Sequence, residues 1–207
     1  DIDGTLLVEG TLHLNPEYYD VIRELRSRGV LVIAASGRQR ASIEKVFTPV
    51  LDDMIFISEN GTCIHSKEYQ YVDKIQPEVV RAFIEEARRY PGCEVGVSHD
   101  NMGYYENIGI YRHLVGDYGY RGKLVDDICD YDDGVCKISV FHHNDAEKMV
   151  GQDFLDRWNR VMHVTVSGKS WVDAANMNVN KGSALKHFQD EYGITPDETL
   201  AFGDNIN

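Results

Sequence analysis

With 207 residues, of which 43% are hydrophobic and 27% charged, the chain is long enough for one domain and a smaller second one, and its composition is globular rather than disordered. A net charge of −13 argues against nucleic-acid and anionic-membrane partners, so any phosphate site must supply its own local positive charge. No stretch reaches the roughly 18 apolar residues of a membrane span. Four scattered cysteines without metal-ligand spacing predict reduced thiols in a cytoplasmic protein.

The sequence begins with two carboxylates in the segment Asp1-Ile2-Asp3-Gly4-Thr5. In an extended segment, residues i and i+2 point the same way, so Asp1 and Asp3 are expected to share one side of the chain. Gly4 lets the backbone turn sharply beneath them. This arrangement allows one carboxylate to attack a substrate while the other moves a proton.

The next 60 residues alternate between helix and buried-strand patterns. Asn15-Pro16-Glu17 is typical of a helix start, and Gly29 is placed to end that helix. The later elements are expected as a buried strand over 30–35, a turn at Ser36-Gly37-Arg38, a helix over 41–47, a strand over 54–58 and a turn at Glu59-Asn60-Gly61. The pattern predicts an α/β fold with a doubly wound, Rossmann-like parallel sheet.

From about residue 76 the pattern changes to short aromatic-rich strands and shorter helices. We expect a helix from 76 to 90, strands over 93–97, 102–106, 136–142 and 161–167, and one helix over 146–158. This patterning predicts an inserted α+β cap domain over 76–170, between the two parts of a catalytic core over 1–75 and 171–207.

The first pattern then returns with a helix over 183–192, a short strand over 199–202 and the loop-like residues Gly203-Asp204. No hydrophobic strand precedes Asp1, and the sequence stops in a loop. We therefore expect these residues to be part of a longer protein whose core is incomplete here at both ends.

The charged and small residues at the predicted strand ends suit phosphoryl transfer, since ligands of open α/β sheets bind beyond the carboxyl ends of the strands. Asp1 is the candidate nucleophile, and Asp3 would protonate the leaving alcohol and then deprotonate the attacking water. Two anions must meet, so Mg²⁺ is expected as cofactor, held by the carboxylates of Asp1 and Asp204 and the backbone carbonyl of Asp3.

Three further residues would hold the phosphoryl group itself. Ser36 and the amide of Gly37 could hold phosphate oxygens at a helix start. Lys181 would neutralise charge on the nucleophile and on the transferring group.

These motifs, in order, resemble those of the haloacid dehalogenase-like hydrolases and most closely the Cof-type sugar-phosphate phosphatases. The resemblance rests on Asp1–Thr5, Ala35-Ser36-Gly37-Arg38, Ser58–Thr62, Asn180-Lys181-Gly182 and Phe202–Asn207. It implies the same roles for Asp1, Asp3, Ser36, Gly37, Lys181 and Asp204, and adds the backbone of Ile2 and the side chain of Asn207 as phosphate contacts. It also implies that the insertion is an α/β cap of the C2 kind.

The leading prediction is a Mg²⁺-dependent phosphatase that hydrolyses a small phosphorylated metabolite, with a sugar phosphate favoured, through an aspartyl-phosphate. A phosphomutase of the phosphomannomutase type and a non-catalytic phosphometabolite-binding protein on the same fold remain as alternatives. The eight histidines show no metal-ligand spacing. The sequence names neither the substrate nor the oligomeric state.

Overall fold

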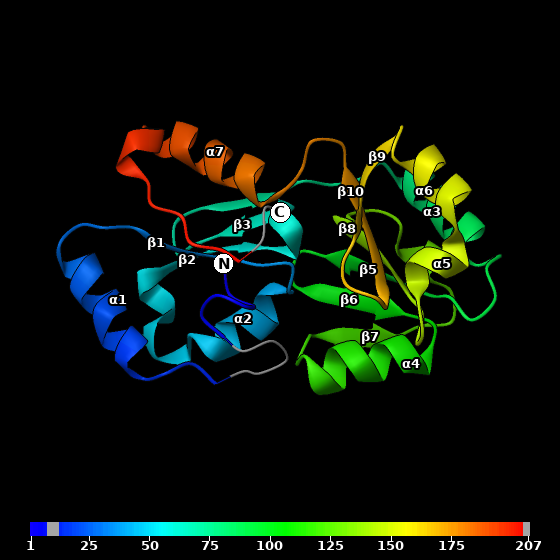
Figure 1. Cartoon of the computed structure of the whole chain (residues 1–207), viewed down its shortest axis with the longest axis horizontal. Coiled ribbons are helices and arrows are strands. Elements are labelled where there is room, and N and C mark those ends of the chain that lie inside the picture. The colour runs from blue at the N-terminus through cyan, green and yellow to red at the C-terminus, as the bar shows by residue number, and fades with distance from the viewer. Residues whose placement is uncertain (8–12, 205–207) are drawn as a thin grey trace. The chain divides into compact units, whose positions relative to one another are not determined.

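The computed structural model describes residues 1–7 and 13–204, and the chain forms two compact units (Figure 1). The first unit comprises Asp1–Val72 and Asn180–Asn207, and the second comprises Asp73–Val179. In the described part of the chain, no helix combines the length and the apolar character that crossing a membrane requires.

A four-stranded sheet with the order β1-β2-β3-β4 organises the first unit. Strands β1 and β2 are parallel, with Val32 opposite Met54, whereas β3 and β4 extend the sheet as antiparallel strands. Its strands and helices are β1 Val32–Ala35, β2 Met54–Ser58, β3 Cys63–His65, β4 Gln70–Val72, α1 Glu17–Ser27, α2 Arg40–Val46 and α7 Lys181–Tyr192. The predicted α/β class is confirmed, although only two of these strands run parallel.

Successive side chains of β2 point to opposite faces of the sheet, and helices pack on both faces. Phe56 packs with Ile22 of α1 and Ile43 of α2 on one face. Ile55 and Ile57 pack with Ala184 and Phe188 of α7 on the other. A strand that is buried on both faces needs an unbroken apolar sequence, and the run 54–57 supplies it.

The second unit is built on a six-stranded, mostly antiparallel sheet with the order β7-β6-β5-β8-β10-β9. Its elements are α3 Pro77–Ala87, β5 Glu94–His99, β6 Met102–Tyr105, α4 Ile108–Tyr111, β7 Gly122–Leu124, β8 Lys137–Phe141, α5 Ala146–Val150, α6 Gln152–Trp158, β9 Met162–Val166 and β10 Trp171–Asn176. The main core lies between one face of the sheet and α3, α5 and α6, where the rings of Phe83 and Phe154 meet edge to face (5.2 Å between ring centroids, 73° between planes).

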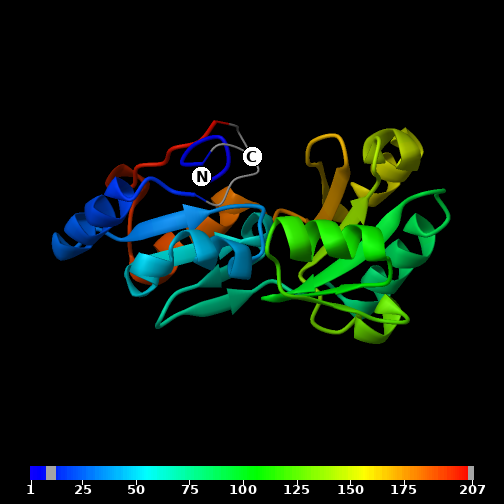
Figure 2. The ribbon, with the colours of Figure 1, turned by 90° about the horizontal axis from the view of Figure 1, so that it is seen from below.

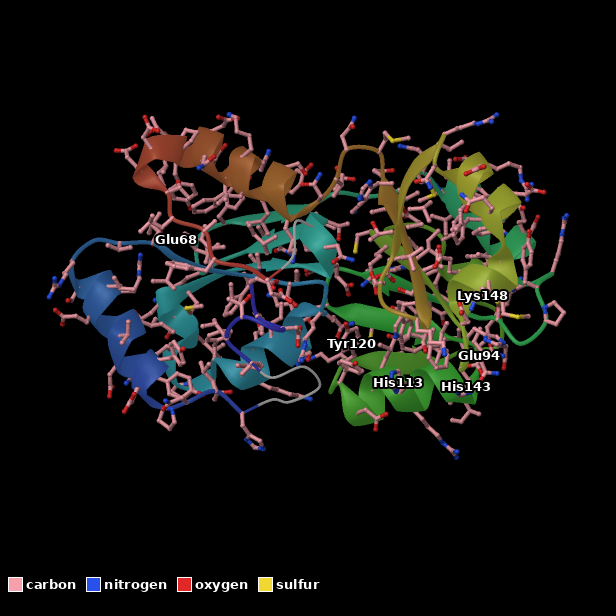
Figure 3. All side chains as sticks on the ribbon, in the orientation of Figure 1. Glu68, Glu94, His113, Tyr120, His143 and Lys148 are labelled. Carbon is pink, nitrogen blue, oxygen red and sulfur yellow. The ribbon has the colours of Figure 1, made fainter. Side chains whose placement is uncertain are left out.

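A smaller aromatic cluster in the second unit includes two of the histidines that the sequence left unassigned. The rings of His113 and His143, both labelled in Figure 3, lie 5.4 and 4.9 Å from the ring of Phe141. Trp171 also packs on Phe141. These histidines therefore take part in aromatic packing. All four cysteines are free thiols.

The second unit extends further along the chain than the sequence predicted. The sequence predicts residues 171–176 as part of the core, but they form β10, which pairs with both β8 and β9. At the other end, the side chain of Asn176 donates to Asp73 and to the Lys74 carbonyl, so these residues also belong to the second unit. The observed boundaries are 72/73 and 179/180 instead of 75/76 and 170/171.

Two predicted elements differ in the structure. The helix expected over 146–158 is divided into α5 and α6 at Gly151, whose φ of 77° cannot continue a helix. The strand expected over 199–202 is absent from the described residues. That segment makes one backbone hydrogen bond to the Asp1 nitrogen, and within residues 1–7 and 13–204 the side chains of Leu200 and Phe202 are 87% and 73% exposed.

Candidate active site

Residues 3–7 form a tight turn, in which Asp3 and Leu7 pair at the two ends. The buried Ile2 offers its carbonyl to the amides of Leu6 and Leu7 (2.9 Å each), and the Gly4 amide returns to the Leu7 carbonyl (2.9 Å). The hydroxyl of Thr5 donates to Oδ2 of Asp1 (3.3 Å). Thr5, a residue of the same motif, therefore helps to hold the Asp1 carboxylate in position.

Lys181, 180 residues away along the chain, lies against Asp1. Its Nζ donates to Oδ1 of Asp1 (2.9 Å), and the two side chains are only 14% and 16% exposed. Lys181 is the first residue of α7, and Asn180 caps that helix by accepting from the Ser183 amide (2.9 Å). Burial lowers the pKa of Lys181, while the charges of Asp204 and Asp3 oppose that shift.

Asp204 lies at the same turn because the segment before it runs alongside the start of the chain. The two segments, blue and red in Figures 1 and 2, are joined where the Asp1 nitrogen donates to the Phe202 carbonyl (3.0 Å). The carboxylate of Asp204 packs so closely on Gly4 that a Cβ at that position would overlap it. Glycine is therefore required at residue 4 both for this contact and for its φ of 76°.

Ser36, Gly37 and Arg38 form the loop between β1 and α2. The Ser36 amide donates to the Ile57 carbonyl of β2 (2.9 Å), which ties the loop to the neighbouring parallel strand. The Ser36 hydroxyl accepts from the Arg38 amide (3.1 Å) and keeps its own hydrogen for donation. The loop thus presents a hydroxyl donor at a fixed position, which is suited to an anionic oxygen.

Arg38 links this loop to Asp3 of the first motif, and the sequence did not predict this contact. Its Nε donates to Oδ2 of Asp3 (2.9 Å), and its Nη2 donates to Oδ1 of the same carboxylate. The Arg38 side chain is 5% exposed. Arginine directly after the Ser-Gly pair was part of the quoted motif, but nothing in a linear sequence shows which carboxylate it reaches.

Some of the oxygen atoms at this turn are suitable ligands for a hard divalent cation. Carboxylates are the ligands that Mg²⁺ prefers, and those of Asp1 and Asp204 are both placed at the turn around Gly4. The Asp3 carboxylate faces Arg38, so only its backbone carbonyl remains as the predicted donor. Across 1–7 and 13–204, no cluster of three His, Cys, Asp or Glu side chains forms a metal site by itself.

The structure therefore brings together Asp1, Asp3, Arg38, Lys181 and Asp204 through hydrogen bonds, close packing and electrostatic interactions, with Ser36 and Gly37 in the same loop as Arg38. The backbone of Ile2 lies between the two acids. The predicted phosphate contact Asn207 lies outside the described residues.

The fold of this core is that of a known class of hydrolase. The family model for haloacid dehalogenase-like hydrolases matches residues 1–207, and the chain therefore belongs to that family. The predicted membership is confirmed, and with it the expectation of an enzyme.

Similar proteins agree with this assignment. The chain is 26% identical over 213 residues to an HMP-PP phosphatase of Citrobacter koseri, and 20% identical over 212 residues to a 5-amino-6-(5-phospho-D-ribitylamino)uracil phosphatase of Escherichia coli. Both matches cover the whole of this chain and 76% and 78% of the relatives. A solved structure from Eubacterium rectale is 31% identical, with a TM-score of 0.90, over 100% of this chain and 80% of that one.

Proposed function

We propose that this protein is a Mg²⁺-dependent phosphatase that releases phosphate from a small phosphorylated metabolite, with sugar phosphates as the leading class. The observation that carries the proposal is that the Lys181 ammonium donates to the Asp1 carboxylate at 2.9 Å. Both side chains are largely buried, and the charges of Asp3 and Asp204 also act on Lys181. The names of the two curated relatives, both phosphatases, support the same reaction class.

In the first step, an oxygen of Asp1 forms a bond to phosphorus as the bond from phosphorus to the leaving oxygen breaks. Asp3, as a carboxylic acid, gives its proton to that leaving oxygen. Lys181, Ser36 and the Gly37 amide bind the phosphoryl oxygens, where negative charge collects in the transition state.

In the second step, Asp3 accepts a proton from water as the water oxygen attacks phosphorus. The bond between Asp1 and phosphorus breaks, which regenerates the Asp1 carboxylate and releases inorganic phosphate. Arg38 holds both oxygens of Asp3 in the structure. Because each carboxylate oxygen has two lone pairs, Asp3 can take up and give back a proton while Arg38 continues to orient it.

Asp1, Asp204 and the carbonyl of Asp3 are the residues that would hold Mg²⁺. When bound, the cation supplies positive charge that allows the anionic nucleophile and the phosphate to approach each other. The unit Asp73–Val179 would act as the cap that selects the leaving group. In this assignment, all the residues that act in the chemical step belong to the first unit.

The test is phosphate release by the full-length protein from a panel of phosphorylated sugars, nucleotides and cofactors, with Mg²⁺ and with EDTA. Asp1→Asn removes the nucleophile and is expected to lower kcat by at least about 10³-fold on any substrate found. Asp20→Asn, an exposed carboxylate on α1, is the matched control and should keep wild-type rates. Full activity in Asp1→Asn would contradict the proposal.

Product analysis separates the alternatives. A phosphomutase would move phosphate within the sugar without releasing it. A non-catalytic protein would bind a phosphometabolite tightly and show no Mg²⁺-dependent turnover.

A further inference from the structure

The turn after β2 has an unusual backbone. Glu59 and Asn60 are consecutive non-glycine residues with φ values of 51° and 60°, in the left-handed region that side chains disfavour. Only Asp100 and Asn178 share this property in the described part of the chain. Two adjacent residues in this conformation persist only where surrounding contacts hold them, and such strain concentrates at functional sites.

Contacts on one side of the turn reach the Ser36 loop. The Asn60 amide donates to the Ser36 carbonyl (3.1 Å), and the Glu59 amide donates to the Arg38 carbonyl (3.0 Å). The side-chain oxygen of Asn60 packs on Gly37, at the position where a Cβ would otherwise stand. The turn thus contacts each residue of the loop Ser36-Gly37-Arg38.

Contacts on the other side reach the residue that carries the active-site lysine. Gly61, with a φ of 104°, packs against the peptide between Asn180 and Lys181. A Cβ on Gly61 would overlap the Asn180 carbonyl and would lie 2.8 Å from the Lys181 nitrogen. The start of α7 can therefore approach this closely only because residue 61 has no side chain.

We propose that Asn60 and Gly61 are positioning residues that fix the distance between the Ser36-Gly37 loop and Lys181. This inference rests on the proposed function, in which these two groups bind oxygens of one phosphoryl group. Because the two groups come from different parts of the chain, one rigid turn between them sets the width of the phosphate site, and small displacements there are costly for binding and rate.

Asn60→Gly is the first test, since glycine keeps the left-handed backbone but removes the contact with Gly37. We expect KM and the inhibition constant of inorganic phosphate to rise by about tenfold, with a smaller change in kcat and little change in Tm. Asn178→Gly, at an exposed residue with a φ of 66°, is the control and should behave as wild type. If Asn60 had only a structural role, its substitution would change Tm and leave the inhibition constant of inorganic phosphate unaltered.

Gly61→Ala is the second test, with Gly29→Ala as its control. Gly29 also has a positive φ (81°), but an added Cβ there meets nothing within 4 Å. We expect Gly61→Ala to lower kcat/KM by at least about tenfold more than Gly29→Ala, because the start of α7 must shift. If Gly61→Ala does not fold, Asn60→Gly decides alone.

The inference is overturned if the phosphate constant and kcat/KM of Asn60→Gly both stay within twofold of wild type. If the wild-type protein hydrolyses no phosphate ester, the proposed function fails instead. Binding of inorganic phosphate to wild type and Asn60→Gly, measured by calorimetry, then still tests the turn: equal affinity in both proteins overturns the inference.

Discussion

Arg38 and Asp3, 35 residues apart in sequence, are joined by two hydrogen bonds from one guanidinium to one carboxylate. The planar fork of arginine matches the two oxygens of a carboxylate, so the pair fixes both the position and the rotation of Asp3. The proposed acid–base residue is therefore oriented by the same loop that carries Ser36 and Gly37.

Replacing Arg38 by lysine tests this orientation. Arg38→Lys keeps the charge but cannot make both hydrogen bonds, so we expect kcat to fall by roughly tenfold or more while KM changes little. Arg28→Lys changes a similar but exposed pair, with Glu24 on α1, and serves as control. Steady-state kinetics on one substrate decides the matter. An unchanged kcat in Arg38→Lys would show that the orientation of Asp3 is set elsewhere.

Lys181→Met should abolish most activity without preventing folding. The variant leaves the largely buried Asp1 beside a neutral side chain and removes the positive charge that the transferring group requires, so a loss of about 10²–10³ in kcat is expected. Lys186→Met, on the same helix but exposed and paired with Asp190, should be near wild type. Equal activity of the two variants would remove Lys181 from the site. Circular dichroism verifies that both are folded.

Asp204→Asn tests the metal assignment through the dependence of rate on Mg²⁺ concentration. A neutral amide is a weaker ligand for a hard dication, so the Mg²⁺ concentration for half-maximal activity should rise by about tenfold or more. Asp197→Asn, on the exposed turn Pro196–Glu198 of the same segment, should leave the titration unchanged. The assignment is wrong if both variants titrate as wild type does.

The second unit carries an ion pair with a defined pH response. The hydrogen bond from Arg88 is the largest influence that lowers the pKa of Asp127 to about 2, and the Cys129 amide adds to it. Because the folded-state pKa lies below the unfolded one, this pair stabilises the fold at neutral pH. That contribution is lost as the pH falls from about 4 towards 2.

Arg88→Gln should accordingly lower the urea midpoint at pH 7, and the difference from wild type should shrink as the pH drops below about 4. Tryptophan fluorescence is the readout, since Trp158 and Trp171 both lie in the second unit. Arg23→Gln removes an exposed ion pair with Asp20 on α1 of the first unit. It is the control and should leave this signal unchanged. A difference that is constant from pH 7 to pH 2 would contradict the expectation.

Local patterns predicted most of the secondary structure. The helix beginning after Asn15-Pro16 forms as α1, and the apolar runs before Ser36 and Glu59 form β1 and β2. These predictions succeeded because start signals, glycine stops and buried runs act over a few neighbouring residues. The hairpin β3–β4 escaped prediction because each strand has only three residues.

The domain boundary failed for a different reason. Trp171–Asn176 forms a strand whose partners are β8 and β9 of the second unit, and pairing across a sheet is not encoded in one segment. The strand expected at 199–202 is also absent, since among the described residues its one strand-like hydrogen bond is to Asp1.

The sequence alone determined the chemical groups of this protein. These are two acids separated by one residue, a Ser-Gly turn, a lysine at a helix start and an aspartate at residue 204. Their order along the chain was also enough to indicate the family. Only the tertiary structure decided which groups meet. Lys181 reaches Asp1, Arg38 takes the Asp3 carboxylate and Gly61 admits the start of α7, because strand pairing and helix packing, rather than sequence separation, set those distances.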